Sequence, residues 1–278
     1  MLVTKRSIIL MAYTTSLLSV SVFAEKISDV RNTKHNFSAT LVPTLGGGGN
    51  RVVSATSEQQ ICVFCHTPHA AEAVAGTPLW NRKLSTETYE TYQSGSLDAT
   101  GPGVPLGQPN GISKLCLSCH DGTLAIGAVN VLNGSFTDRD PNTEDIVMQG
   151  TGPGGTMAPG AGTATGFTRA LGINLTNDHP ISLTYDSALA LRDGEMRDPA
   201  FSDHVKTRRR GVKPLLPLQD GQVQCNTCHD PHIRDTSGEN IKFLRVNRFQ
   251  TAEPVQNSFD ENNDIICLAC HDKAGWAG

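Results

Sequence analysis

The chain of 278 residues is poor in the residues that usually build a protein core. Aromatic residues make up only 5% of it, whereas 27 glycines and 15 prolines are spread through long polar stretches. After the first 24 residues, no run of apolar residues approaches the roughly 20 needed to cross a membrane. All eight cysteines fall in four short motifs, so none remains for a disulfide, a zinc site or a free nucleophile. A large conventional hydrophobic core is therefore not expected.

The four motifs share the pattern Cys-x-x-Cys-His, which is the attachment signal of c-type haem. Two thiols one helical turn apart can add to two vinyl groups of a porphyrin, and the adjacent histidine then binds the iron. The pattern predicts four covalently bound c-type haems. The thioether residues would be Cys62, Cys65, Cys116, Cys119, Cys225, Cys228, Cys267 and Cys270, and the proximal iron ligands His66, His120, His229 and His271.

Two other chemistries use Cys-x-x-Cys. Paired knuckles can hold zinc, and a single one beside a βαβ pattern can be a thioredoxin-like redox couple. Neither explains a histidine after the second cysteine in all four copies, so haem is favoured.

The first 24 residues are typical of an export signal. Lys5 and Arg6 precede an apolar stretch from about residue 7 to 20, and Ala24 ends a segment that a signal peptidase would accept. We expect cleavage after Ala24 and export to the periplasm or the outer cell surface, without stable membrane insertion. Loss of Lys5 and Arg6 changes the formal net charge from −4 to −6, which disfavours nucleic acid as a partner.

The sequence predicts a mostly irregular, loop-rich fold with short α-helices, packed around a chain of four stacked haems. Ser57 would cap a helix at the first motif and Ser113 one at the second, where Gly122 would end it. Residues 260–268 would lead into the fourth motif, whereas the third lacks a good cap and would be a single turn. Gly/Pro-rich runs at 46–49, 100–111 and 150–166 are expected to be loops.

The longest of these loops divides the motifs two and two. A single tetrahaem domain over residues 25–278 would thus contain two haem pairs, roughly 25–148 and 167–278. The first motif of each half continues through a proline to a further histidine, His69 or His232, and the second motif does not. The chain therefore reads as a duplicated pair of haem sites.

His69 and His232 lie too close in sequence to His66 and His229 to bind the same iron, because axial ligands occupy opposite faces of a porphyrin. Three residues span at most about 10 Å. If these histidines bind other irons, neighbouring haems are held nearly in contact. The alternative is a surface histidine after a turn proline.

Five histidines lie outside the motifs, and four irons need four distal ligands. His35, His69, His179 and His232 are predicted to be these ligands, with Asp178 orienting His179. His204, beside a basic run, is the spare or alternative ligand. Ligation by two histidines gives low potentials and leaves no open position for a substrate. Electron transfer is therefore favoured over catalysis.

The alternation of Cys-x-x-Cys-His-x-Pro-His with a plain motif, together with residues 33–36 and 178–181, resembles the doubled Cys-x-x-Cys-His multihaem cytochromes. Haem number, length and order are most similar to the tetrahaem outer-surface cytochromes that polymerise into extracellular filaments. The resemblance covers most of the chain after residue 24. It implies stacked haems with all-histidine ligation, and other redox proteins or extracellular acceptors as partners.

The same resemblance implies that one distal ligand comes from a neighbouring subunit. His35, close to the expected mature N-terminus, would be the residue that reaches across. A head-to-tail contact that does not close into a ring would then generate a filament.

Two other functions stay open from the sequence. One is a monomeric periplasmic shuttle, since five candidate histidines can satisfy a single chain. The other is a multihaem reductase of small nitrogen or sulfur compounds, which would need one haem with an open axial position. Fibres in electron micrographs would exclude the simple shuttle.

We predict that the purified protein has purely low-spin haem spectra and does not bind CO after reduction, because two histidines occupy each iron. Absorption spectroscopy with and without CO measures this directly. Binding of CO would instead indicate an open iron and favour the reductase.

Overall fold

The computed structural model describes residues 27–40, 53–74, 76–158, 169–207, 215–233, 243–246, 250, 252–255, 258–260 and 263–272. The expected export signal, the glycine run 46–49, residues 159–166 of the longest loop and the basic run 208–213 lie outside the described residues. All eight cysteines and all nine histidines lie within them.

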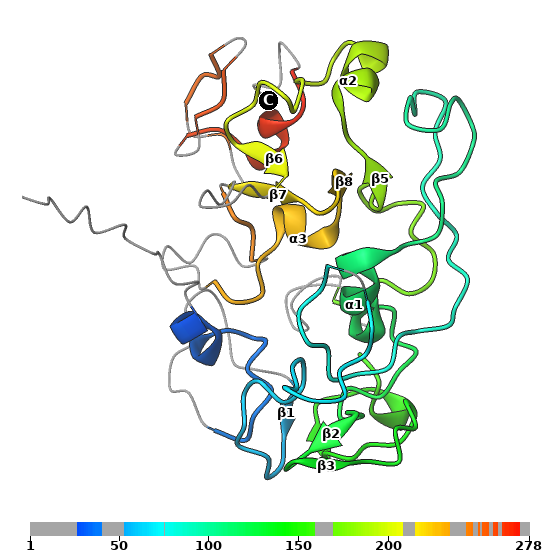
Figure 1. Ribbon diagram of the computed structural model, residues 1–278, viewed down its shortest axis with the longest axis vertical. Helices are drawn as coiled ribbons and strands as arrows, with labels where there is room; N and C mark the ends of the chain where they lie inside the picture. The colour runs from blue at the N-terminus through cyan, green and yellow to red at the C-terminus, as the bar shows by residue number, and fades with distance from the viewer. Residues whose placement is uncertain are drawn as a thin grey trace, which may run out of the picture.

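The described chain is loop-rich, with short helices and two-stranded sheets (Figure 1). The helical elements are η1 (Ile27–Asn32), α1 (Gly111–His120), η2 (Pro153–Gly155), α2 (Ser187–Asp193), α3 (Cys225–Cys228) and η3 (Ile266–Ala269). The strands are β1 (Ser54–Ala55), β2 (Val131–Leu132), β3 (Ser135–Phe136), β4 (Met148–Gln149), β5 (Leu183–Thr184), β6 (Val205–Thr207), β7 (Leu216–Leu218) and β8 (Gln222–Val223). Antiparallel pairs join β1 to β4, β2 to β3 and β5 to β8, and a parallel pair joins β6 to β7.

The helix expected after Ser57 at the first motif does not form. The carbonyl of Glu58 accepts a hydrogen bond from the backbone of Ala39, and its carboxylate accepts one from the backbone of Gln60. These bonds hold the segment in an irregular conformation, and the motif itself is a turn.

The helices at the second and third motifs have other N-caps than the sequence predicts. Helix α1 begins at Gly111 with Asn110 as its N-cap, so Ser113 lies inside the helix and not at its cap. It ends at His120, and Gly122 follows with φ of 74°, a conformation that glycine adopts without strain. Helix α3 is a single turn, but it does have a cap, because Gln224 forms a capping box with Thr227. The fourth motif lies on the 3-10 turn η3.

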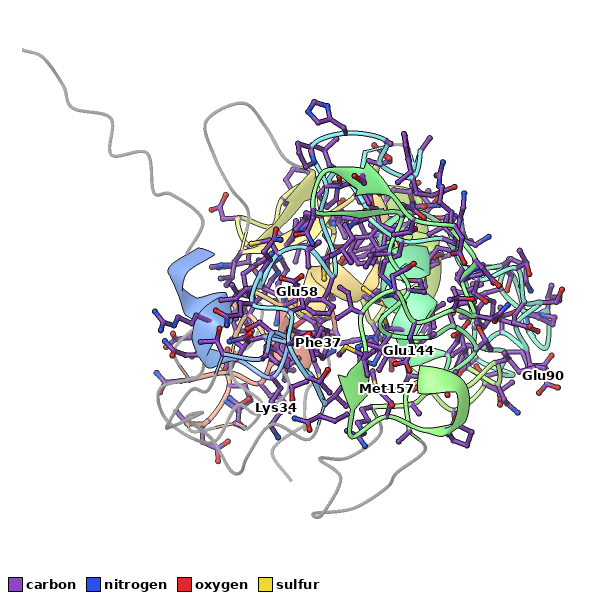
Figure 2. All side chains as sticks on the ribbon, turned by 90° about the horizontal axis from the view of Figure 1, so that it is seen from below. Lys34, Phe37, Glu58, Glu90, Glu144 and Met157 are labelled. Carbon is purple, nitrogen blue, oxygen red and sulfur yellow. The ribbon has the colours of Figure 1, made fainter. Side chains whose placement is uncertain are left out.

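The described residues form three apolar clusters, of which the smallest contains Tyr89, Leu117 and Leu175 and the two larger ones lie toward the two ends of the molecule. The lower one packs beside β1 and β4 and contains Phe37, Val53, Ala55, Val63, Phe64, Ile126, Val129, Ile146, Met148 and Met157. The upper one packs around β7 and η3 and contains Tyr185, Leu189, Val205, Leu216, Leu218, Val223, Val246 and Ala269. Figure 2 shows Phe37 and Met157 within the body of the lower part and Glu90 at its edge. Cysteines of the motifs border both clusters.

A buried hydrogen-bonded joint connects α1 to α3. The side chain of Gln224 is 2% exposed. Its Oε1 accepts bonds from the backbone N–H and hydroxyl of Ser113 and from the hydroxyl of Ser182, and its Nε2 donates to Asn110. The Ser113 hydroxyl also accepts a bond from the backbone of Cys225. One amide thereby fixes the second motif relative to the third, near the middle of the molecule (Figure 1).

We predict that Gln224→Ala lowers the free energy of unfolding by about 2–4 kcal/mol, because several buried donors and acceptors lose their partner at once. The matched control is Gln59→Ala at an exposed position, where a change within about 0.5 kcal/mol is expected. Denaturant titration of both variants with equal haem content is the measurement. Equal stabilities for the two variants would show that the joint contributes nothing.

Candidate haem sites

The four motifs form the same local turn although they lie on different elements. In the first, third and fourth motifs, the backbone N–H of the histidine donates to the carbonyl of the first cysteine, at 2.8, 3.0 and 2.9 Å. The second motif is the last turn and a half of α1. Each turn brings its two cysteines to neighbouring positions, as attachment to one edge of a porphyrin requires.

Thiols of successive motifs lie near one another. Burial, followed by the charge of Cys119 in the second motif, raises the pKa of Cys65 to about 12. A side-chain hydrogen bond joins Cys116 to Cys225 of the third motif. This bond has the largest effect in raising the pKa of Cys116, and burial has the next largest. Burial and then Cys267 of the fourth motif raise the pKa of Cys228 to about 11. The motifs thus follow one another in space in their sequence order.

The raised pKa values disfavour a role for these three thiols as nucleophiles. A reactive cysteine needs a thiolate near neutral pH, and burial opposes that form. Arg82 lowers the pKa of Cys65 and Arg245 lowers that of Cys228, but burial has the larger effect on both.

Three motif histidines each face a histidine from elsewhere in the chain. The ring centres of His120 and His35 are 6.1 Å apart, and those of His66 and His232 are 6.2 Å apart. His271 and His179 form the third pair, at 6.5 Å.

These separations fit an iron between the two rings. A metal–imidazole bond is about 2 Å long, so two such bonds and the half-widths of two rings add to about 6 Å. A direct hydrogen bond between two rings, with about 3 Å between the nitrogens, would bring the ring centres closer together. The three pairs therefore have the spacing that axial ligands on opposite faces of a haem need.

Nδ1 is hydrogen-bonded in three of these rings, so a metal would bind them through Nε2. Nδ1 of His120 donates to the carbonyl of Arg169, and Nδ1 of His179 donates at 2.9 Å to the carbonyl of Pro180. Nδ1 of His232 lies 3.1 Å from Oδ1 of Asp230. Such bonds select the tautomer of a metal-binding histidine and orient its ring.

Asp230 is an ionised anchor for His232. Burial raises the pKa of its carboxyl group, but the hydrogen bond with His232 and the charge of Arg245 outweigh that effect and bring the pKa to about 2. Arg245 Nη1 lies 3.1 Å from Asp230 Oδ2. Sequence reasoning did not identify Asp230, although its position two residues before His232 is a usable signal. It assigned the anchor of His179 to Asp178, whereas the acceptor is the carbonyl of Pro180.

The imidazole of His35 has a strongly lowered pKa. Burial, followed by the nearby charges of His120, His232 and His229, lowers its pKa to about 3. The ring is therefore neutral at physiological pH, which is the form that binds a metal. Its Nδ1 is buried without a hydrogen-bond partner among the described residues.

Within its own chain, His35 contacts His120, Phe37 and Phe243. The expectation that it reaches a haem of a neighbouring subunit stays a prediction. Hydrogen bonds in the segment 30–38 fold the chain inward, among them those from Asn36 to the carbonyl of Arg31 and from Ser38 to Asn36.

The two remaining histidines occupy different surroundings. His69 is exposed at the surface, where hydrogen bonds between its backbone and the hydroxyl of Thr67 fix the turn after Pro68. The ring of His204 packs edge-on against Phe259, with centres 5.1 Å apart. Neither ring is brought against another histidine in any contact found among the described residues.

The part of the chain that is described contains no group of three or more His, Cys, Asp and Glu side chains arranged to hold a metal ion. An axial pair of histidines would not form such a group. Nor do these residues include a helix long and apolar enough to cross a membrane.

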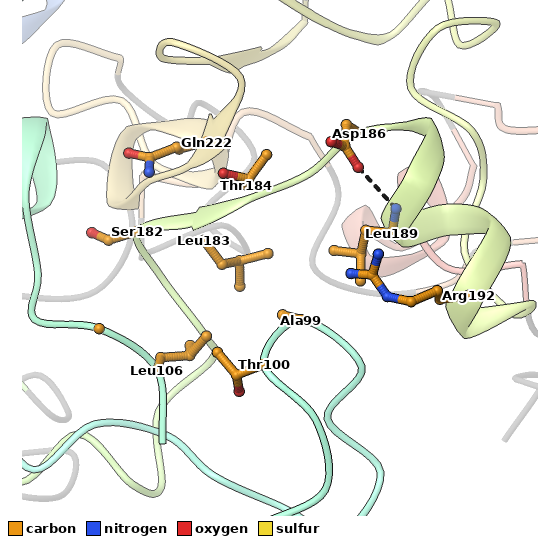
Figure 3. A pocket seen from close by; sticks show the side chains of 11 residues that line it. Ala99, Thr100, Leu106, Ser182, Leu183, Thr184, Asp186, Leu189, Arg192 and Gln222 are labelled. Atoms are coloured by element: carbon orange, nitrogen blue, oxygen red, sulfur yellow. Dashed lines mark hydrogen bonds between the residues drawn. The ribbon is translucent and has the colours of Figure 1, made fainter. Parts of the chain in front are cut away.

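A cleft of about 250 Å³ lies between the loop at 99–107 and the segment containing β5 and α2 (Figure 3). Its lining includes Asp186, whose carboxylate caps α2 through the backbone of Leu189, and Arg192. None of the motif residues or candidate ligands lines it. The cleft is therefore separate from the haem residues.

No protein-family model matches the chain, and no curated protein matches it either. The functional interpretation accordingly depends on the motifs and on the three histidine pairs described above.

Proposed function

We propose that this protein is a tetrahaem c-type cytochrome that conducts electrons along closely packed haems held by pairs of histidines. The observation that carries the proposal is the set of three histidine pairs. Each combines one motif histidine with one histidine from outside the motifs, at a separation suited to a single iron. Covalently attached haem would supply a metal that gains and loses one electron.

On the basis of these pairs we propose distal ligands for three of the four sites. His232 serves the iron of the first motif, His35 that of the second and His179 that of the fourth. Because His229 and His232 lie three residues apart, the first and third haems are held within about 10 Å of backbone. The first and third haems would thus be close neighbours, although their motifs lie in different halves of the chain and are not consecutive.

Electron transfer is supported over enzymatic turnover by the same pairs. An iron with a histidine on each face has no open position for a substrate. Cysteines of successive motifs lie near one another in space. Haems attached to them would therefore form a continuous series, as electron conduction requires. Its function in extracellular electron transfer, with redox proteins or extracellular acceptors as partners, is part of this proposal and is consistent with the export signal.

We predict that His35→Ala, His179→Ala and His232→Ala each convert one of the four haems to a high-spin form that binds CO after reduction. The matched control is His204→Ala, which removes a ring packed on Phe259 and is expected to leave four low-spin haems. Absorption and electron paramagnetic resonance spectra give the count. Four low-spin haems in all three ligand variants would refute the assignment.

Polymerisation into a filament is a second candidate function, and the exposure of His69 favours it. The inward position of His35 suits ligation within its own chain, so His69 is the better placed residue to reach a haem of another copy. Its turn is fixed by the Thr67 hydroxyl, which presents the ring outward at little entropic cost.

For this candidate we predict that His69→Ala abolishes fibres in electron micrographs and leaves one iron with a missing ligand. Fibres that persist with four low-spin haems would exclude His69 as a ligand between copies. A third outcome is that the protein is monomeric both before and after the mutation, and that the variant lacks the ligand at all protein concentrations. This outcome would place His69 on an iron of its own chain.

A further inference from the structure

Arg82 is a buried cation that forms no salt bridge among the described residues. The residue is 1% exposed. Its guanidinium donates to three backbone carbonyls, through Nη1 to Ile126 and Ala128 and through Nη2 to Ala125. Its Nε is buried without a partner among the described residues. Burying a guanidinium against neutral dipoles alone is costly, so a nearby group that benefits from positive charge is expected.

The loop that receives Arg82 is rigid. Backbone bonds join Ile126 to Gly155 and Ile146 to Gly127. A Cβ atom on Gly127 would lie 1.9 Å from the Ile146 carbonyl oxygen, so only glycine allows this approach. The carbonyls are therefore fixed acceptors, and the positive charge is held in one place.

Asn81 places this charge beside the first motif. Its backbone N–H donates to the carbonyl of Cys65 at 2.9 Å, and its side chain donates to the carbonyl of Val63. Cys65 and Cys119 both pack against the cluster that contains Ile126. Arg82, the next residue along the chain from Asn81, therefore lies beside the first motif.

One acid also interacts with this charge. Asp145 accepts a bond from the backbone of Val129 at 2.9 Å, and Arg82 lowers its pKa while burial, the larger effect, raises it. The negative charge of Asp145 thus opposes part of the positive field of Arg82. Replacing Asp145 is therefore a second way to change the field at this place.

From this arrangement we infer that Arg82 is a redox-tuning residue, whose fixed positive charge stabilises the reduced state of the haem attached to Cys62 and Cys65. The inference rests on the proposed haem function. Reduction adds one electron to the iron and makes the site more negative, so a buried cation favours it. The first haem would therefore be easier to reduce than it would be without Arg82, and electrons would be held preferentially at that end of the chain.

The test is an anaerobic redox titration of the full protein with dithionite, followed by haem absorbance. In Arg82→Gln, which keeps hydrogen-bond donors but removes the charge, the equilibrium constant for reducing one of the four haems should fall roughly tenfold. Arg82→Lys, which keeps the charge, should titrate like the wild type. Arg192→Gln is the matched control, because Arg192 is an exposed arginine on α2.

Asp145→Asn gives an independent test in the opposite direction, since it removes negative charge and leaves the bonds of Arg82 in place. The same haem should become easier to reduce. Titrations of Arg82→Gln and Asp145→Asn that both superimpose on the wild type would overturn the inference. If Arg82→Gln does not assemble four haems, an unchanged titration of Asp145→Asn overturns it alone. A wild-type protein without four covalent haems would instead refute the proposed function.

Discussion

The three pairs of histidine rings from distant parts of the chain are the contacts on which the proposed haem function depends. Each pair joins a motif to a segment far away in sequence: His35 to α1, His232 to the first motif and His179 to the fourth. Two-stranded sheets and helices of ten residues or fewer provide few other long-range connections. With an iron between each pair, coordination bonds would take over much of the role that core packing has elsewhere.

Buried polar side chains complete this architecture. Asn81, Arg82 and Gln224 are almost entirely inaccessible to solvent, and each bonds to backbone or side-chain groups of another loop. A chain with few aromatic residues cannot position irregular loops by apolar packing alone, because such packing is not directional. Hydrogen bonds supply the direction, so a loop without regular secondary structure still has a fixed position.

Sequence reasoning reached the motifs, the sparse secondary structure and the set of histidines that deserved attention. Its predictions were wrong where a local sequence pattern suggested one hydrogen-bond partner and the folded chain supplies another. Ser57 suggested a helix cap, but Glu58 pairs with Ala39. Asp178 suggested an anchor for His179, but Nδ1 of His179 bonds to the carbonyl of Pro180. Arg82 and Gln224 carried no recognisable pattern, because their partners lie 43 and 111 residues away.

The sequence by itself determined the chemistry: four Cys-x-x-Cys-His motifs, each a short turn whose local hydrogen bonds need nothing beyond five residues. Only the tertiary structure decided which distant histidine faces which motif, and that His35 turns inward while His69 stays exposed. The physical reason is that a motif's geometry is set by neighbours along the chain. Which histidine faces a motif depends on how irregular loops close over long distances, and those loops are held by hydrogen bonds that leave no periodic signal in the sequence.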